Sequence, residues 1–453
     1  MSFIADRQTL EDLNMLGKHR HGSVYSIFNK TKTRGGERLL EQWFQSPLQA
    51  PEEINKRSSL FSFIHQLDVD FPFDPVLFSK AENYLESAGP ASFPFTVADI
   101  ALKKLKGSFF HDYQFNQTYE GLMAAIQFLR DCVSFIGKME RAGDGIGKLH
   151  FENERAILSR IFDDERLQWL MSKQAIQQCS FMEVCRYDYL LRQGLAEEMK
   201  VVLESVYRLD VYTSVATVAA QRNFSYAEAL AASENCFETS GLWHPSLIKG
   251  VANVLDFDRN KNMLFLTGAN MAGKSTLMKA FGIVVYLAHM GFPVPAGKLR
   301  FSVMQGLYSS INVSDNLNSG YSHFYAEVLR VKTVAEQVSN GLRLVVLFDE
   351  LFKGTNVKDA FDATLEVTKA FSEYKKSFFI ISTHIIEVGE KLIENEKLRA
   401  VYLPTLISGN TPKYTYKLEP GITSDRQGML IIQNEGILEL LAEDSTNSIK
   451  NRQ

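Results

Sequence analysis

One short segment, Gly268–Thr276, constrains the fold of this chain more than any other feature. It follows the apolar run Met263–Leu266 and opens a stretch with helical spacing from Lys274. A strand, a loop of the pattern G-x-x-x-x-G-K-[ST] and a helix, in that order, predict a phosphate-binding loop, or P-loop. Its glycines let the loop curl so that backbone N–H groups converge on phosphate oxygens, and the helix dipole points its positive end at the same place. The candidate ATP-binding residues are Gly268, Ala269, Asn270, Met271, Ala272, Gly273, Lys274, Ser275 and Thr276.

An acidic pair, Asp349-Glu350, ends a second apolar run at Leu344–Phe348. In a P-loop protein, an aspartate at this place holds the magnesium shell, and the adjacent glutamate orients and polarises the water that attacks the γ-phosphate. Lys274 is expected to reach the β- and γ-phosphates, and the Ser275 hydroxyl is expected to ligate magnesium. The sequence therefore predicts an ATPase with ATP and Mg²⁺ as cofactors, with Lys274 and Glu350 as candidate catalytic residues and Ser275 and Asp349 as metal ligands.

The two halves of the chain differ in their hydrophobic pattern. Residues 1–235 carry apolar residues at three- and four-residue spacing, which predicts a mostly helical domain. The long helices expected there are Tyr119–Met139, Glu152–Ile176 and Tyr187–Ala219. In residues 236–453, short apolar runs alternate with helical stretches and end in a strand expected at Tyr414–Leu418. This alternation predicts an α/β P-loop domain with a mainly parallel sheet that is covered by helices on both faces.

Composition and charge argue against some classes of protein. The formal net charge is −4, so the chain lacks the overall basic character of many nucleic-acid-binding proteins. A local cluster of Lys103, Lys104 and Lys106 is more often a solvated helix face than a DNA contact. No apolar run approaches the ~20 residues of a membrane-spanning helix, and the acidic, polar N-terminus is not typical of a secretory signal. We therefore expect a cytoplasmic protein with no membrane partner.

The motifs together resemble those of the MutS family of DNA mismatch-repair ATPases, which belongs to the wider ABC-type ATPase class. Thr267–Thr276 is similar to the family's P-loop T-G-P-N-M-[GA]-G-K-S-T, with Ala269 in place of the usual proline. Asp349–Asn356 resembles D-E-[IL]-G-R-G-T-[ST], with Lys353 in place of the arginine. Thr383-His384, after the strand expected at Ser377–Ser382, matches the family's T-H switch. The resemblance therefore adds His384 to the candidate catalytic residues.

A further segment, Asp315–Phe324, resembles the signature that serves the ATP site of the opposite subunit in this family. The resemblance implies a homodimer formed through the ATPase domains. The signature residues implied to act in trans are Ser319, Gly320 and Ser322.

The N-terminal half shares the resemblance. Asp6–Leu16 and Asn29–Leu48 resemble the start of the MutS core helical domain, and Trp243-His244-Pro245 is similar to an R-H-P segment without its arginine. We expect no N-terminal mismatch-binding domain before this region, and a clamp that is shortened or absent. The family's reading motif F-x-E occurs at Phe181-Met182-Glu183 within a helical stretch, so we assign Phe181 to packing.

The resemblance implies an ATPase that couples ATP hydrolysis to DNA binding in mismatch repair or related genome maintenance. Its contacts to duplex or branched DNA are expected to be backbone contacts. The alternative is a nucleotide-gated interaction protein that acts on branched DNA, ribosomes or a protein partner without recognising mismatches. Both functions use the same ATP-site motifs, so the sequence leaves the two open.

Overall fold

The computed structural model describes residues 3–17, 22–89, 91–110, 114–140, 146–168, 179–311, 323–408, 411–423 and 432–437. The chain divides into two compact units. The sheet unit contains residues 1–27, 46–55 and 222–453, and the helical unit contains residues 28–45 and 56–221. This division differs from the expected domains 1–235 and 236–453, because the N-terminal segment packs on the sheet and the last long helix of the helical unit ends at Arg222.

Seven strands of the described chain form the main sheet of the sheet unit, in the order β1-β6-β7-β8-β4-β9-β12. Neighbouring strands are parallel from β1 to β9, and only β12 is antiparallel to its neighbour. The expected mainly parallel sheet is thereby confirmed. The strands are β1 (Ile4–Ala5), β4 (Met263–Gly268), β6 (Gly306–Ser310), β7 (Leu344–Asp349), β8 (Phe378–Ser382), β9 (Leu398–Leu403) and β12 (Glu419–Pro420).

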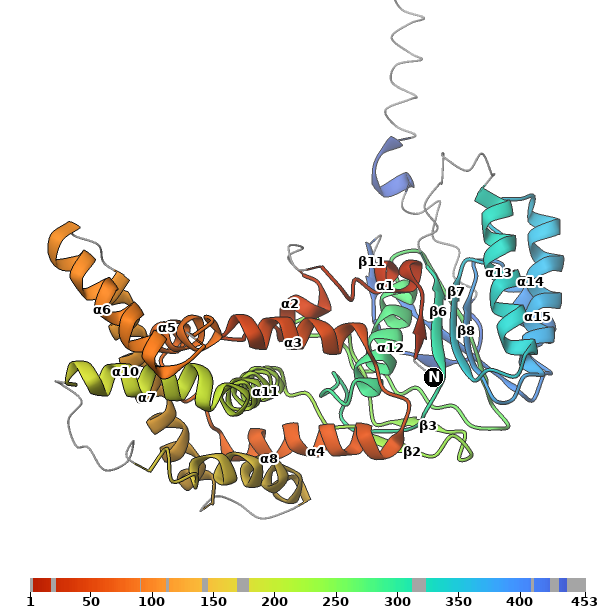
Figure 1. The fold of residues 1–453 in the computed structure, drawn as a ribbon. Coiled ribbons are helices and arrows are strands. Elements are labelled where there is room, and N and C mark those ends of the chain that lie inside the picture. The colour runs from red at the N-terminus through yellow and green to blue at the C-terminus, as the bar shows by residue number, and fades with distance from the viewer. Residues whose placement is uncertain are drawn as a thin grey trace, which may run out of the picture. The chain divides into compact units, whose positions relative to one another are not determined.

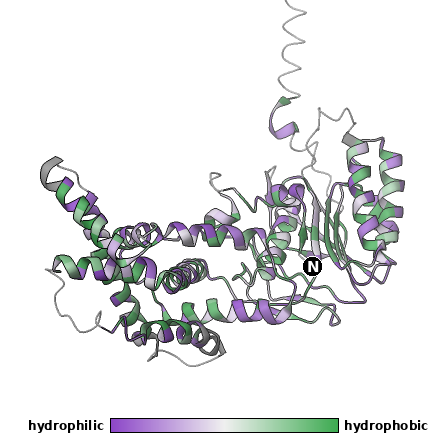
Figure 2. Ribbon diagram, in the orientation of Figure 1, coloured by the Kyte–Doolittle hydropathy of each residue, from purple (hydrophilic) through white to green (hydrophobic). Residues whose placement is uncertain are grey.

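Helices cover both faces of this sheet (Figure 1). α13, α14 and α15 lie together on one face, and α1 and α12 lie on the other. The central strands are apolar and buried along most of their length, as a sheet covered on both faces requires (Figure 2). The helices are α1 (Arg7–Asp12), α12 (Lys274–His289), α13 (His323–Ser339), α14 (Val357–Ser372) and α15 (Ile386–Leu392).

The other described strands of the sheet unit form two small sheets. The first has the order β2-β5-β3, and the second is the hairpin β10-β11. Their strands are β2 (Glu228–Leu230), β3 (Phe237–Thr239), β5 (Leu299–Ser302), β10 (Thr405–Ser408) and β11 (Thr411–Tyr414). The strand expected at Tyr414–Leu418 was therefore wrong. Tyr416 has a left-handed backbone (φ 55°), and the Asn253 side chain bonds the Tyr416 carbonyl and the Leu418 N–H in place of a neighbouring strand.

The helical unit is built from long helices that pack through aromatic side chains. Phe78 of α5 contacts Phe128 of α7 edge to face, with ring centroids 5.1 Å apart. The helix expected at Glu152–Ile176 was wrong in its C-terminal part: α8 ends at Phe162, and residues 169–178 lie outside the described residues. The helices are α3 (Arg34–Gln45), α5 (Pro75–Glu86), α6 (Phe93–Phe110), α7 (Gln114–Glu140), α8 (Ile146–Phe162), α10 (Phe181–Tyr189), the π-helical turn η1 (Leu190–Gly194) and α11 (Ala196–Arg222).

Two helices lie near the boundaries between the units, namely α2 (Val24–Phe28) and α4 (Pro51–Leu67). α4 begins with Pro51, followed by two glutamates, and these residue types are favoured in the first turn of a helix. No described helix is both long and apolar enough to cross a membrane.

Candidate nucleotide-binding site

The P-loop joins β4 to α12, as the sequence predicts. Gly268 (φ 151°) and Gly273 (φ 101°) both have positive φ, which glycine adopts at little cost. At Gly273 a Cβ would also lie only 3.1 Å from the Tyr416 ring. Met271 adopts the left-handed region as well (φ 68°), although it carries a side chain. The backbone of the loop therefore turns sharply twice before the first residue of α12.

Lys274 begins α12 and is buried. Its Nζ donates to the carbonyl oxygens of Gly268 (2.9 Å) and Ala269 (3.2 Å), so the ammonium lies inside the curl of the loop. Burial lowers the pKa of Lys274, and the nearby carboxylates of Asp349 and Glu350 partly oppose that effect. The positive charge is thus held where phosphate-binding loops place it.

The acidic pair lies directly beside the P-loop. The Ser275 hydroxyl donates to Asp349 Oδ2 across 2.5 Å. The other carboxylate oxygen of Asp349, Oδ1, is buried and has no hydrogen-bond partner among the described residues. The order of the strands explains why the acidic pair lies beside the P-loop. β7 and β4 are parallel and are separated only by β8, so their carboxyl ends lie at the same edge of the sheet.

Glu350 is held at both carboxylate oxygens. Oε1 lies 2.5 Å from His384 Nε2, and Oε2 accepts from Lys353 Nζ at 3.3 Å. The backbone of Glu350 is left-handed (φ 53°), and its N–H donates to the Ser382 carbonyl at the end of β8. The hydrogen bond from His384, together with the charge of Lys353, lowers the pKa of Glu350 to about 2. The carboxylate is therefore ionised at neutral pH.

A cavity of about 470 Å³ opens beside the P-loop. Most of its lining was not predicted from the sequence as part of the site. Leu403 and Tyr416, which lie far from the P-loop in the sequence, supply one wall. The residues that supply the other wall are Leu242, Trp243, His244, Leu247, Lys249, Gly250, Val251 and Asn253. Among these, Trp243 and His244 lay in a segment singled out by the resemblance. Burial, with the charge of Lys279, lowers the pKa of His244 and favours its neutral form.

Other residues named from the sequence lie elsewhere. Ser319, Gly320 and Ser322 fall outside the described residues, which resume at His323. In the helical unit, Lys103 pairs with Asp99 (2.7 Å), and Lys104 lies over the rings of Phe115 and Phe181. The F-x-E pattern opens α10, where Glu183 forms a capping box with Ser180. Phe181 and Glu183 thus have local structural partners.

A P-loop at the end of a parallel strand, with an acidic pair at the end of the next strand but one in the sheet, defines the class of P-loop nucleotide-binding proteins. Comparison with protein families extends this assignment. The family model for MutS domain V matches residues 264–451, and that for MutS domain III matches residues 8–216. The chain belongs to the MutS family.

Three similar relatives are each named DNA mismatch repair protein MutS. That of Anaplasma phagocytophilum is 28% identical over 236 residues, which are 51% of this chain and 28% of the relative. That of Ehrlichia chaffeensis is 28% identical over 234 residues, covering 48% of this chain and 29% of the relative. That of Streptococcus sanguinis is 29% identical over 193 residues, covering 43% and 22%. The matched region thus spans less than a third of each relative.

Proposed function

We propose that this chain binds ATP at the P-loop, hydrolyses it, and couples the cycle to DNA binding. The observation that carries the proposal is the 2.5 Å contact between Ser275 Oγ and Asp349 Oδ2. This contact joins the P-loop to the acidic pair, and Glu350 and His384 lie immediately beyond it. An ABC-type ATPase of the MutS family needs these four groups in one place.

Ser275 and Asp349 fit a magnesium ion. Both offer oxygen atoms, which Mg²⁺ prefers, and Asp349 Oδ1 is a buried oxygen with no hydrogen-bond partner among the described residues. When bound with the nucleotide, magnesium neutralises charge on the β- and γ-phosphates. The Ser275 hydroxyl and the Asp349 carboxylate would hold it, directly or through water.

Lys274 and the loop amides would bind the phosphates. The Lys274 ammonium donates to two loop carbonyls in this structure, and both bonds lie within the curl that phosphate oxygens would enter. A negatively charged phosphate is a stronger acceptor than a carbonyl, so the ammonium would exchange one of these partners for the nucleotide. The N-terminus of α12 adds its dipole at the same point.

Glu350 would orient the attacking water. A carboxylate with a pKa of about 2 is a weak proton acceptor at neutral pH, so its main contribution is to accept a hydrogen bond from water and fix its direction of attack. His384 would set the carboxylate orientation through the 2.5 Å contact. The cavity of about 470 Å³ beside the loop would take the adenine, with Trp243, Met271 and Tyr416 among its apolar lining.

Two variants test binding and hydrolysis separately. Lys274→Ala removes the ammonium, so we expect weaker ATP binding and no turnover. Glu350→Gln keeps the shape of the side chain, so we expect ATP binding to persist while single-turnover hydrolysis falls by about 10²-fold or more. Glu366→Gln, in an exposed pair with Lys369, is the matched control and should hydrolyse ATP at the wild-type rate. Wild-type hydrolysis by Glu350→Gln protein would exclude Glu350 from this role.

DNA coupling is tested by filter binding to duplex, G·T-mismatched and branched DNA, with and without ATP. We expect binding that depends on nucleotide and weakens steeply with salt, since backbone contacts release counterions. We also expect a preference for the mismatch of less than roughly tenfold, or ~1.4 kcal/mol. An active ATPase that binds none of these DNAs would favour the alternative, a nucleotide-gated protein with a ribosomal or protein partner.

A further inference from the structure

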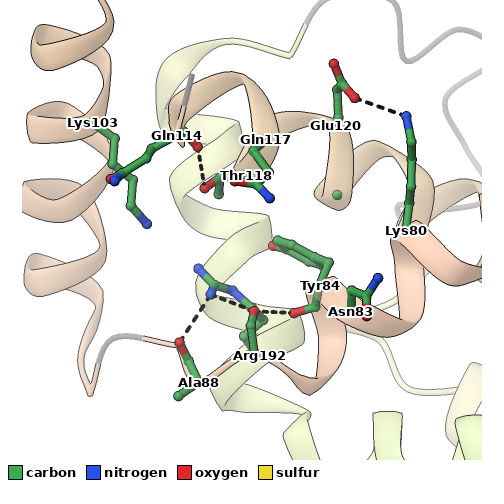
Figure 3. Close-up of a pocket in the computed structure, with 12 residues that line it drawn as sticks. Lys80, Asn83, Tyr84, Ala88, Lys103, Gln114, Gln117, Thr118, Glu120 and Arg192 are labelled. Carbon is green, nitrogen blue, oxygen red and sulfur yellow. Dashed lines mark hydrogen bonds and ion pairs between the residues drawn. The ribbon is translucent and has the colours of Figure 1, made fainter. Parts of the chain in front are cut away.

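A cavity of about 700 Å³ lies within the helical unit, between α5, α6, α7 and the π-helical turn η1 (Figure 3). We propose that it binds a small molecule that carries a phosphate group on a hydroxylated body, such as a sugar phosphate. Its volume is in the range of small-molecule sites. The proposal is independent of the ATP site, because every described residue that lines this cavity belongs to the helical unit.

The cavity wall contains a buried ion pair. Arg192 donates to both carboxylate oxygens of Asp188, from Nε at 2.9 Å and from Nη2 at 2.6 Å. The Tyr84 hydroxyl donates to the same carboxylate at 2.5 Å, and the guanidinium lies 5.0 Å from the centre of the Tyr84 ring. The Arg192 side chain is only 6% exposed, yet it lines the cavity. These contacts fix the guanidinium in place before any ligand arrives.

The backbone at Arg192, which lies in the cavity wall, is not a regular α-helix. Residues 190–194 form a π-helical turn, and such turns occur frequently at functional sites. Two glycines allow the close packing beside it. A Cβ at Gly121 would lie 2.8 Å from the Tyr84 ring, and a Cβ at Gly89 would lie 2.8 Å from Arg192 Cβ. The local sequence is thus compatible with this wall only because both positions lack a side chain.

The charges around the cavity favour an anion. Among the described residues, the cations that line it are Lys80, Lys103 and Arg192, and the carboxylate is Glu120. Lys80 pairs with Glu120 at 3.1 Å (Figure 3), whereas the partners of the other two cations, Asp99 and Asp188, do not line the cavity. A bound ligand would therefore face the positive ends of two ion pairs. Arg192 Nη1 already donates to the Ser87 hydroxyl (3.2 Å) and to the Ala88 carbonyl (3.3 Å), two residues that also line the cavity. A phosphate oxygen is a stronger acceptor and would compete for this donor.

The remaining lining includes several neutral polar side chains, which argue for a hydroxylated body. Asn83, Gln117 and Thr118 offer neutral donors and acceptors, whereas Tyr84 and Ala88 supply the larger apolar groups. The Thr118 hydroxyl already donates to the Gln114 carbonyl at 3.0 Å. A flat apolar ring would displace water from the exposed Asn83 and Gln117 amides without replacing its hydrogen bonds. Sugar hydroxyls would satisfy them. The same chemistry is present in a free sugar phosphate and in the phosphorylated 5′ end of a nucleic acid strand.

The test is calorimetric titration of the full chain with ribose 5-phosphate. We expect saturable binding that Lys80→Gln and Lys103→Gln each weaken by about tenfold, as the loss of a charged hydrogen bond predicts. Lys200→Gln, which breaks an exposed pair with Glu197 in the same unit, is the matched control and should bind as the wild type does. Lys274→Ala protein should also bind, because the P-loop is a separate phosphate site.

A second titration compares 5′-phosphorylated and 5′-hydroxyl single-stranded oligonucleotides. Preference for the phosphorylated strand over ribose 5-phosphate, with the same loss in Lys103→Gln, would identify a nucleic acid end as the source of the phosphate and would support the proposal. Absence of saturable binding by either probe in the millimolar range would overturn it. Binding that Lys274→Ala abolishes and Lys103→Gln leaves unchanged would assign the signal to the P-loop and would also overturn it.

Discussion

Individual residues at the candidate ATP site adopt backbone conformations that side chains disfavour. Met271 and Glu350 have φ values of 68° and 53°. A left-handed residue that carries a side chain costs about 1–2 kcal/mol, and such residues persist where their surroundings fix them. At Glu350 the fixing contacts are the bond from its N–H to Ser382 and the contact with His384. The strain is located where we propose that hydrolysis occurs.

His289 is a residue whose protonation should control stability. It is fully buried, its Nδ1 lies 2.7 Å from the Val285 carbonyl, and its Nε2 accepts from the Met304 N–H at 2.9 Å. Protonation would remove that acceptor, and burial lowers the pKa of His289 from 6.5 to about 4. Between these two values the unfolded chain binds a proton that the folded chain does not. This contribution to stability is therefore complete above pH 6.5 and lost as the pH falls towards 4.

The expected loss from His289 is roughly 3 kcal/mol over that interval. His289→Gln keeps one donor and one acceptor but cannot titrate. The free energy of unfolding, measured by urea denaturation at several pH values, should depend less on pH in this variant than in the wild type. Equal slopes for the two proteins between pH 4 and 6.5 would contradict the assignment.

At the scale of elements, the N-terminal segment that contains β1 and α1 is an integral part of the sheet unit. β1 adds a parallel edge strand to β6, and α1 packs on the same strand. Arg330 of α13 donates to Asp6, to Thr9 and to the Ser309 carbonyl, and so joins the segment to β6 and α13. This edge of the sheet is therefore formed by chain that precedes the helical unit in sequence.

Asp12, at the end of α1, should contribute strongly to this docking. Its Oδ2 accepts from the Ser309 hydroxyl at 2.6 Å and from the Ile311 N–H at 3.0 Å. Asp12→Ala leaves both buried donors without this acceptor, so we expect a loss of about 2–4 kcal/mol in the free energy of unfolding. Glu11→Ala, on the exposed face of the same helix, removes only the surface pair with Arg7 and should cost less than about 1 kcal/mol. Similar midpoints of urea denaturation for the two variants would show that the docking contacts are unimportant.

At the scale of the whole molecule, the active unit is expected to be a dimer in which Ser322 of one copy completes the ATP site of the other. Lys274→Ala and Ser322→Ala proteins should each be inactive alone, but a mixed dimer contains one site in which both residues are intact. An equal mixture should therefore recover about a quarter of wild-type turnover, because half of randomly assorted dimers are mixed. ATPase assays of the mixture, with sedimentation to establish the oligomeric state, provide the measurement. Turnover by a strictly monomeric species at a rate independent of protein concentration would exclude the dimer.

The sequence by itself determined the features that depend on neighbouring residues. The P-loop could be predicted because strand, glycine loop and helix follow one another directly between Met263 and Thr276. The start of α4 could be placed for the same reason, since proline and acidic residues act within the first helical turn. The carboxyl-end positions of Asp349 and His384 followed from the apolar runs before them.

Only the tertiary structure decided which distant segments meet. Strand order brings Ser275 within 2.5 Å of Asp349, and the fold brings Leu403 and Tyr416 to the cavity beside the P-loop. No local pattern marks Leu403 or Tyr416, or the Arg192 wall of the cavity in the helical unit. The physical reason is that periodicity reports which face of an element is buried, whereas the partner that buries it depends on the order in which all the strands and helices pack.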